Sequence, residues 1–300
     1  MMISLKKERK ESLLDTLFIV PAVVFILFFI LWPIIQSLAL SFFKWDGVGP
    51  WEFVGINNYI KMFTRDKFFY LALKNTTIFT VVTTIGEMAI GLTLAILIDL
   101  GIRGWKAFRF IFFLPVALSQ VAISLLWVKI YARDGLINSF LGVIGLETLQ
   151  RVWLGDARYA LWCVCLVSIW QYGGWHMIFF LAGMQGIDPQ IYESAKIDGA
   201  STIRRIFSIT LPLLKNVFFI ITILSLILGF KNFDLVYVLT TGGPAHATEV
   251  LTTQVYQHAF DVLRFGYASV LAVILVVISL IFSLFYIKVT GYRKEITEDL

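Results

Sequence analysis

The stretch that decides the fold is DPQIYESAKIDGASTIRRIFSITLP, residues 188–212, a polar segment set between two apolar runs. Asp188 can accept hydrogen bonds from the free amides at the start of a helix, and Pro189 suits the first helical position. Gly199 lies where a helix C-terminus favours a residue that adopts positive φ, and Ser201 can cap a second helix. The stretch is therefore predicted to form two short helices with a bend between them.

The second of these helices is predicted to be amphipathic and to end at Pro212. Its apolar residues recur at spacings of three and four and share one face, opposite Arg204, Arg205 and Ser208. The apolar face comprises Ile203, Ile206, Phe207, Leu211 and Leu214. A helix of this kind can rest on a bilayer surface or against another protein.

Residues 193–212 resemble the EAA loop of the membrane subunits of ATP-binding-cassette importers. The loop has the pattern Glu, any residue, Ala, three residues, Gly, nine residues, Ile, any residue, Leu-Pro, and Ser194 here replaces the usual first Ala. In that family the loop is a cytoplasmic helix-turn-helix that docks into a cleft of an ATPase subunit. The resemblance thus implies a coupling role for Glu193, Ala195, Asp198, Gly199, Ala200, Ile209, Leu211 and Pro212.

The composition is that of an integral membrane protein. The 300 residues are 59% hydrophobic and 15% charged, with a mean hydropathy of +0.83, whereas soluble domains carry about 25% charged residues. The net charge of +5 is modest and its cations are scattered, which argues against a nucleic-acid partner. Cys163 and Cys165 lie in one apolar run without a metal-ligand motif, so they are interpreted as packing residues and no metal site is expected.

Six apolar runs are long enough to cross a bilayer, which takes about 20 residues. The chain is therefore predicted to be all-α with six transmembrane helices and with both termini on one side. The run at 17–40 follows four cations and is interpreted as a retained anchor, since it is too long for a signal peptide. The runs are 17–40, 76–99, 110–131, 159–183, 215–236 and 267–288.

The distribution of lysine and arginine favours cytoplasmic termini. With that orientation, the cytoplasmic loops and tails hold most of the cations. The predicted organisation is a cytoplasmic tail (1–16), a six-span domain (17–288) that includes the coupling loop (188–212), and a second cytoplasmic tail (289–300). Asn75 or Thr76 is expected to cap the second span. A kink is expected at Pro115 in the third span.

Glu87, between Gly86 and Gly91, is an ionisable residue near the middle of the second span. A charged group there costs about 2.5 kcal/mol or more by insertion scales, so it needs a protein or water-facing position. Two interpretations stay open. Glu87 either bonds to a neighbouring helix or partner subunit, or it acts directly in transport.

The fourth span concentrates Trp170, Gln171, Tyr172 and Trp175 around a glycine pair. Sugars are bound by polar groups together with aromatic faces, and this segment offers both. The alternative is that the aromatic residues anchor the helix in the bilayer interface and the glycines serve helix packing. His176 is interpreted as a hydrogen-bonded membrane residue, and no catalytic constellation is found.

The fifth span and the residues after it narrow the resemblance. The segment FKNFDLVYVLTTGGP, residues 230–244, and the pattern at 248–268 look like the signature of maltose-type carbohydrate-importer permeases, as does the segment 53–76. The resemblance adds Asn232, Asp234 and Tyr237 to the substrate pathway. Lys231 and Asp234, three residues apart, are expected to pair. The chain departs from the large enterobacterial member in lacking extra N-terminal spans and a large external insert.

The resemblance implies a type I importer permease fold in the bacterial inner membrane. The implied partners are a second related permease, a dimer of ATPase subunits that bind ATP and Mg, and an extracytoplasmic sugar-binding protein. This chain has no GxxxxGK[ST] phosphate loop and is expected to bind no cofactor and to be no enzyme. The competing hypotheses are a secondary transporter or channel acting alone and a membrane-embedded enzyme.

Overall fold

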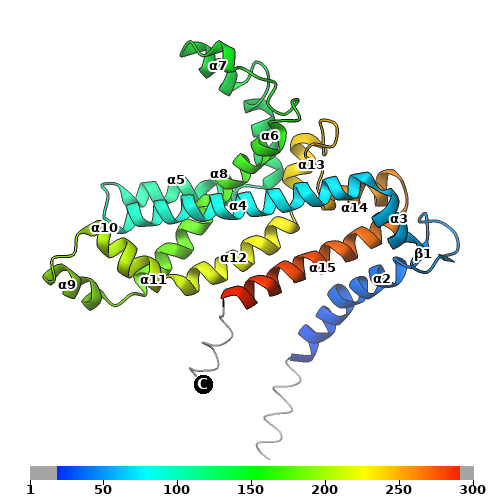
Figure 1. Cartoon of the computed structure of the whole chain (residues 1–300), viewed down its shortest axis with the longest axis horizontal. Helices are drawn as coiled ribbons and strands as arrows, with labels where there is room; N and C mark the ends of the chain where they lie inside the picture. The colour runs from blue at the N-terminus through cyan, green and yellow to red at the C-terminus, as the bar shows by residue number, and fades with distance from the viewer. Residues whose placement is uncertain (1–18, 291–300) are drawn as a thin grey trace, which may run out of the picture. The chain divides into compact units, whose positions relative to one another are not determined.

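The computed structural model describes residues 19–290, which are almost wholly helical (Figure 1). The predicted tail 1–16 and residues 291–300 of the C-terminal tail lie outside the described residues. The chain divides into two compact units. One comprises the described residues up to Arg65 together with Val255–Ile274, and the other comprises Asp66–Gln254 together with the described residues after Ile274.

Four described helices are long and apolar enough to cross a membrane: Ile19–Leu40, which contains η1 (Leu27–Leu31) and α2 (Trp32–Leu40), α4 (Lys67–Asp99), α8 (Ala160–Gln185) and α15 (Phe265–Thr290). Two further spans are formed if each of two bent helix pairs counts as one. The pairs are α5 (Trp105–Ala117) with α6 (Gln120–Ile130), bent by 100°, and Thr202–Leu213 with α12 (Lys215–Phe230), bent by 63°. The total of up to six agrees with the six predicted runs.

The first unit contains a small hairpin that a buried asparagine holds to the next helix. Strands β1 (Phe43–Lys44) and β2 (Glu52–Phe53) are antiparallel, with Phe43 opposite Phe53. In α3 (Asn57–Arg65), the Asn58 amide donates to the Ser41 and Phe43 carbonyl oxygens at 3.0 and 2.9 Å. Asn58 lies in the first turn of α3 and is buried. The unit also includes η4 (Gln257–Asp261).

In the second unit, glycines allow α8 to pack closely on two neighbouring helices. A Cβ at Gly91 of α4 would overlap the backbone and Cβ of His176, and a Cβ at Gly174 would overlap the Phe112 carbonyl oxygen of α5. Glycine permits such close approach because it has no side chain. These two contacts fix α4 and α5 against α8 near the middle of the latter.

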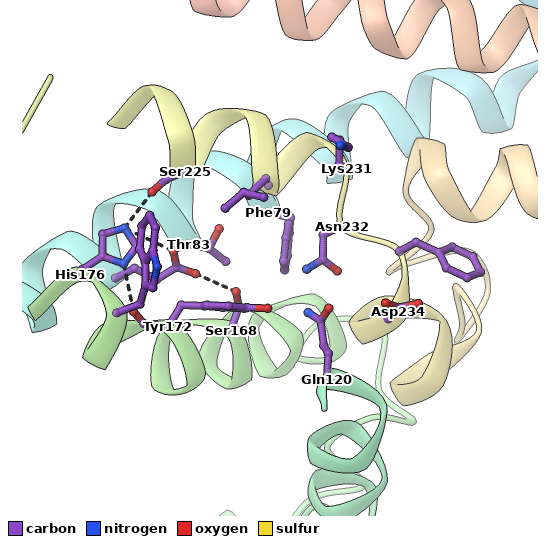
Figure 2. A pocket seen from close by; sticks show the side chains of 15 residues that line it. Phe79, Thr83, Gln120, Ser168, Tyr172, His176, Ser225, Lys231, Asn232 and Asp234 are labelled. Carbon is purple, nitrogen blue, oxygen red and sulfur yellow. Dashed lines mark hydrogen bonds and ion pairs between the residues drawn. The ribbon is translucent and has the colours of Figure 1, made fainter. Parts of the chain in front are cut away.

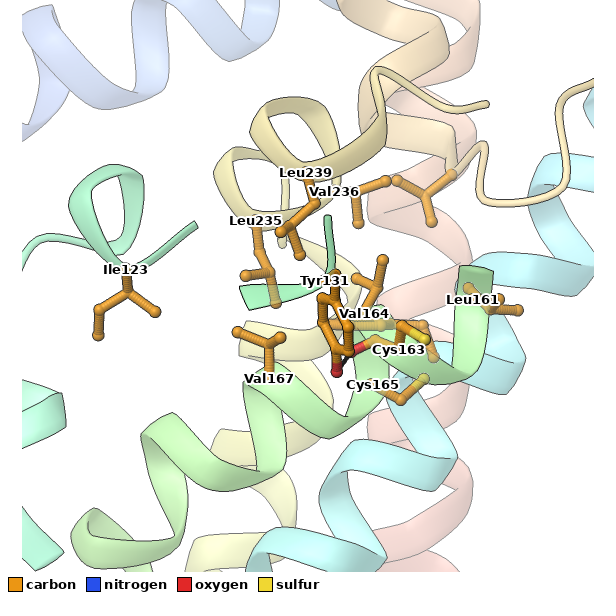
Figure 3. Close-up of a cluster of buried hydrophobic side chains, with 12 residues drawn as sticks. Ile123, Tyr131, Leu161, Cys163, Val164, Cys165, Val167, Leu235, Val236 and Leu239 are labelled. Carbon is orange, nitrogen blue, oxygen red and sulfur yellow. Dashed lines mark hydrogen bonds between the residues drawn. The ribbon is translucent and has the colours of Figure 1, made fainter. Parts of the chain in front are cut away.

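A buried apolar cluster ties α6 and α13 (Asp234–Thr240) to α8 (Figure 3). Leu235 and Leu239 of α13 pack with Val164 and Val167 of α8. The Tyr131 hydroxyl donates to the Cys163 carbonyl oxygen at 3.2 Å. Cys163 and Cys165 are buried free thiols in this cluster, as their interpretation as packing residues requires.

The third predicted span is broken rather than kinked. Pro115 lies inside α5, and the chain becomes extended three residues later, at Leu118 and Ser119, before α6 starts at Gln120. Proline removes one backbone donor and crowds the preceding turn, which is why the bend was predicted at Pro115 itself. In the structure α5 continues through Pro115 to Ala117, and the break follows it. The break matters because it brings the start of α6 into the interior of the unit.

The second span begins earlier than predicted, at Lys67. The Asp66 carboxylate caps it by accepting from the amides of Phe68 and Phe69 at 2.9 and 3.1 Å. Asn75 and Thr76, the predicted caps, lie inside α4 and bind the loop before α14 (Leu251–Tyr256). The Asn75 amide donates to the carbonyl oxygens of His246 and Glu249, and the Thr76 hydroxyl accepts from the Leu251 amide.

The segments joining the spans are themselves ordered by side chains. Asn138 of α7 (Leu136–Val143) donates to the Arg151 carbonyl oxygen at 2.8 Å and accepts from the Trp153 indole at 2.9 Å, which closes the segment that includes η2 (Glu147–Leu149). In the loop after α13, burial raises the pKa of Glu249, and its hydrogen bond with His246 partly opposes that effect.

Candidate functional site

A cavity of about 280 Å³ lies inside the second unit, between α4, α6, α8, α12 and the turn that joins α12 to α13 (Figure 2). Its walls combine aromatic rings, hydroxyls, amides and ionisable groups. The lining residues are Phe79, Thr83, Glu87, Gln120, Ser168, Tyr172, Trp175, His176, Ser225, Leu228, Gly229, Lys231, Asn232, Phe233 and Asp234.

Four of the seven predicted pathway residues line this cavity, namely Tyr172, Trp175, Asn232 and Asp234. The other three are placed elsewhere. Trp170 is 41% exposed and contacts the Trp127 ring edge-on. Gln171 is buried outside the cavity lining, and Tyr237 stacks on Phe233 with ring centroids 4.9 Å apart.

Glu87 is held by a neighbouring helix, as one of its two interpretations required. The Ser168 hydroxyl of α8 donates to one Glu87 carboxyl oxygen at 2.8 Å. Glu87 as a whole residue is 6% exposed. The same carboxyl group also lines the cavity. Glu87 therefore both holds α4 to α8 and forms part of the cavity wall.

His176 forms hydrogen bonds through both ring nitrogens, one within α8 and one to α12. Its Nδ1 is 3.0 Å from the Tyr172 carbonyl oxygen, which can only accept, so Nδ1 carries a hydrogen. Its Nε2 is 2.8 Å from the Ser225 hydroxyl and 3.8 Å from a Glu87 carboxyl oxygen. In a hydrolase triad the acid orients Nδ1, whereas here Nδ1 bonds to backbone, so the arrangement is a structural network. The interpretation of His176 as a hydrogen-bonded membrane residue is confirmed.

Gln120 and Asn232 point toward one another across the cavity (Figure 2). The Gln120 amide nitrogen and the Asn232 amide oxygen are both buried without a hydrogen-bond partner in the described part of the chain. Gln120 begins α6 and Asn232 lies between α12 and α13, so each stands at a helix break. Sequence reasoning missed Gln120. The signal that could have found it is the polar pair Ser119–Gln120 just after Pro115 in an apolar run.

Lys231 and Asp234 do not form the predicted ion pair. No ion pair joins them in the described part of the chain, and Asp234 is the first residue of α13 rather than a residue of the preceding helix. The turn at Asn232 and Phe233 removes the helical spacing on which the prediction rested. Both charged groups therefore remain available at the cavity wall.

The coupling-loop stretch has the predicted two helices and bend. Asp188 caps α9 (Pro189–Ile197) by accepting from the Gln190 amide at 2.9 Å, and Gly199 has φ of +75°. Ser201 caps α10 (Thr202–Arg205) by accepting from the Arg204 amide. The second helix continues through η3 (Ile206–Thr210) and α11 (Leu211–Leu213), so it ends one residue after Pro212.

The predicted coupling residues are distributed over the loop surface. Glu193, Asp198, Gly199 and Pro212 are exposed, whereas Ala195, Ala200, Ile209 and Leu211 are half-buried. The predicted apolar face of the second helix is partly exposed and partly buried. Ile203 and Phe207 are 70% and 66% exposed, while Leu214 is buried in the core of α4, α8 and α12.

Comparison with known proteins matches residues 87–289 to the family described as the binding-protein-dependent transport system inner membrane component. The chain belongs to this family. The match covers the cavity-lining helices from Glu87 onward and the whole coupling loop. The chain is thus a permease subunit of an ATP-binding-cassette transporter.

Relatives in the family are similar over nearly their whole length. The probable ABC transporter permease protein YurN of Bacillus subtilis is 39% identical over 290 residues, which cover 95% of this chain and 99% of the relative. The lactose transport system permease protein LacF of Rhizobium radiobacter is 36% identical and covers 93% and 94%.

Two solved chains of a bacterial alginate ABC transporter share the fold. The first has a TM-score of 0.84 at 24% identity and covers 96% of this chain and 98% of its own. The second, in a complex with an alginate pentasaccharide-bound periplasmic protein, has a TM-score of 0.82 at 23% identity, covering 93% and 94%. The type I importer permease fold implied by the sequence is confirmed.

Proposed function

We propose that this permease carries a sugar, in the class of oligosaccharides and related carbohydrates, into the cell. The observation that carries the proposal is the cavity, where Tyr172, Trp175 and Phe79 offer ring faces and Gln120 and Asn232 offer unused amide groups. A sugar hydroxyl can accept from one amide and donate to the other, while its apolar ring face stacks on an aromatic. The names of relatives for lactose and alginate transport support the same class.

The permease supplies half of the translocation pathway in this proposal, and a second related permease supplies the other half. The cavity of about 280 Å³ is smaller than the roughly 300–1,000 Å³ of pockets that enclose drug-sized ligands. An oligosaccharide therefore needs additional walls. A second chain facing the first across the cavity provides them.

The coupling loop docks on an ATPase subunit and transmits the conformational change of the ATPase to the permease. ATP and Mg belong to the two ATPase subunits, and this permease has no enzymatic step of its own. Closure of the ATPase dimer moves the docked loops together and opens the cavity outward, where an extracytoplasmic binding protein delivers the sugar. The exposed Ile203 and Phe207 beside the bend support docking of this loop on a protein.

The coupling loop and both termini are proposed to face the cytoplasm. A cysteine at Thr202 is expected to react with a membrane-impermeant maleimide only in inverted vesicles, and a cysteine at Ser139 only in intact cells. The reason is that a single span, α8, separates the two positions and therefore puts them on opposite faces. Both positions are exposed. Native Cys163 and Cys165 are buried and are expected to stay unlabelled. Labelling at Thr202 from outside would contradict the orientation.

Sugar uptake is expected to fall about fivefold to tenfold in Asn232→Ala and Gln120→Ala, because each change removes an amide that faces the cavity. A loss of one hydrogen bond of about 1–1.5 kcal/mol corresponds to roughly that factor. The measurement is uptake of a panel of labelled oligosaccharides, with lactose included, by cells that express each variant at equal levels.

Trp170→Ala is the matched control for these two variants. Trp170 was a predicted pathway residue, but its side chain lies outside the cavity lining, so we expect near-normal uptake in this variant. Normal uptake in both amide variants would show that the cavity is not part of the sugar pathway. A tenfold loss in Trp170→Ala with none in the amide variants would move the pathway to the outer face of α8.

A further inference from the structure

A second cavity, of about 470 Å³, lies between the coupling loop and the ends of two spans. It is bounded by the C-terminal ends of α4 and α8, by α9, and by the helix that begins at Thr202. The Tyr192 and Thr210 hydroxyls share a hydrogen bond of 2.9 Å that joins the two helices of the loop. This cavity shares no lining residue with the first.

Four charged side chains line this cavity, two of each sign: Asp99, Glu193, Lys196 and Arg205. None of the four is within ion-pair distance of an opposite charge among residues 19–290. Arg205 donates from Nη2 to the Thr202 hydroxyl at 3.1 Å, but its Nε is buried and has no acceptor. A buried donor without an acceptor is costly, so the site favours a ligand that brings one.

The rim of this cavity continues into an apolar side of α4. Ile85, Leu97 and Leu100 are 63%, 37% and 52% exposed and lie on one side of the helix, and Leu100 lines the cavity itself. Asp99, also in the lining, is the last residue of this span. The charged cavity therefore lies beside the last residue of a candidate membrane span, and exposed apolar residues lead from it along that span.

We propose that this cavity binds the headgroup of phosphatidylethanolamine. The phosphate accepts from Arg205 and Lys196, the ammonium donates to Asp99 and Glu193, and the acyl chains lie along the exposed side of α4. A guanidinium is well suited to a phosphate because it presents several donors in one plane. A lipid with both charges satisfies all four side chains, whereas an anionic lipid such as phosphatidylglycerol leaves the two acids unpaired.

Phosphatidylcholine also carries both charges, but its three methyl groups leave the nitrogen without an N–H donor for the carboxylates. The site is therefore expected to distinguish ethanolamine from choline at the same net charge. The lipid would join the coupling loop to the spans, since Glu193, Lys196 and Arg205 come from the loop and Asp99 comes from α4. This inference is independent of which sugar is carried.

The test uses the complete purified transporter, stripped of lipid in detergent, with each dioleoyl lipid added separately. Thermal unfolding followed by intrinsic fluorescence is expected to show a rise in Tm with phosphatidylethanolamine at least twice that with phosphatidylcholine or phosphatidylglycerol. Native mass spectrometry is expected to retain phosphatidylethanolamine preferentially. Arg205→Gln is expected to remove this preference in both measurements.

Arg204→Gln is the matched control, because Arg204 is the exposed neighbour of Arg205 and does not line the cavity. We expect it to keep the lipid preference. If Arg205→Gln does not assemble, Asp99→Asn tests the ammonium side and should reduce the effect of phosphatidylethanolamine to that of phosphatidylcholine. Equal Tm shifts with all three lipids, or a preference retained in both cavity variants, would overturn the proposal. Stabilisation by soluble O-phosphoethanolamine but not by the lipid would overturn it as well.

Discussion

Replacing Gly199 with valine is expected to abolish sugar uptake while the permease still inserts into the membrane. Gly199 has φ of +75°, a conformation that costs a residue with a Cβ roughly 1–2 kcal/mol and a β-branched residue more. Gly199 stands at the bend between the two coupling helices, so relief of this strain would change the angle between α9 and α10. Docking on the ATPase depends on that angle in the proposed mechanism.

The added side chain itself meets nothing within the permease, because no atom lies within 4 Å of the Cβ position at Gly199. The expected defect is therefore one of loop geometry and docking rather than of internal packing. Uptake, co-purification of the ATPase subunits and ATP hydrolysis stimulated by loaded binding protein are to be measured together. Gly199→Asp is expected to behave like the valine variant, and Glu193→Lys to be milder.

Gly104→Val is the control for backbone strain alone. Gly104 has φ of +79° and also has open space around its Cβ position, but it lies in the turn before α5. We expect this variant to keep most of its uptake. Equal losses in the two variants would show that backbone strain in either turn is sufficient. Normal stimulated hydrolysis in Gly199→Val would show that the loop has no part in coupling.

The coupling loop could be predicted from the sequence because its signals are local. Asp188, Pro189, Gly199 and Ser201 each act on backbone within a few residues of themselves, and each occupies the predicted position. The six apolar runs could also be predicted from the sequence. A segment that crosses a bilayer must be long and hydrophobic, whatever its tertiary contacts are.

The cavity could be predicted only in part, because its walls come from four helices far apart in the sequence. Tyr172 and Trp175 were found since they lie in one segment rich in aromatic residues. Gln120 was missed because its role depends on the break after Ala117, and the amide that it faces belongs to Asn232. No local pattern reports which side of a buried helix points inward, which is also why Trp170 was included.

The error over Asn75 and Thr76 has the same origin. Both residues are good helix caps, and propensity correctly identified their capacity to bond with backbone groups. The groups that they bind belong to residues 246–251 instead of to their own helix. A bond across more than 170 residues of sequence cannot be inferred from the neighbours of either partner.

Replacing Gly174 with alanine is expected to have the second large effect, on assembly and on uptake together. A Cβ at this position would overlap the Phe112 carbonyl oxygen, a backbone atom that moves only if α5 moves. Overpacking of this kind costs roughly 1–3 kcal/mol or more. Because α5 leads directly to the break before Gln120, its displacement would also move that amide away from Asn232.

We expect Gly174→Ala to lower the Tm of the purified transporter by several degrees and to reduce uptake at least tenfold. Gly186→Ala is the control at the C-terminal cap of the same helix. Gly186 has a negative φ of −81°, and the nearest atom to its Cβ position, the Gly183 carbonyl oxygen, is 3.4 Å away. That variant should be close to normal in both measurements. A Gly174→Ala transporter with unchanged Tm would show that α5 and α8 do not approach as closely as the structure has them. Unchanged uptake despite a lowered Tm would show that the position of Gln120 does not limit transport, because the same displacement of α5 produces both effects.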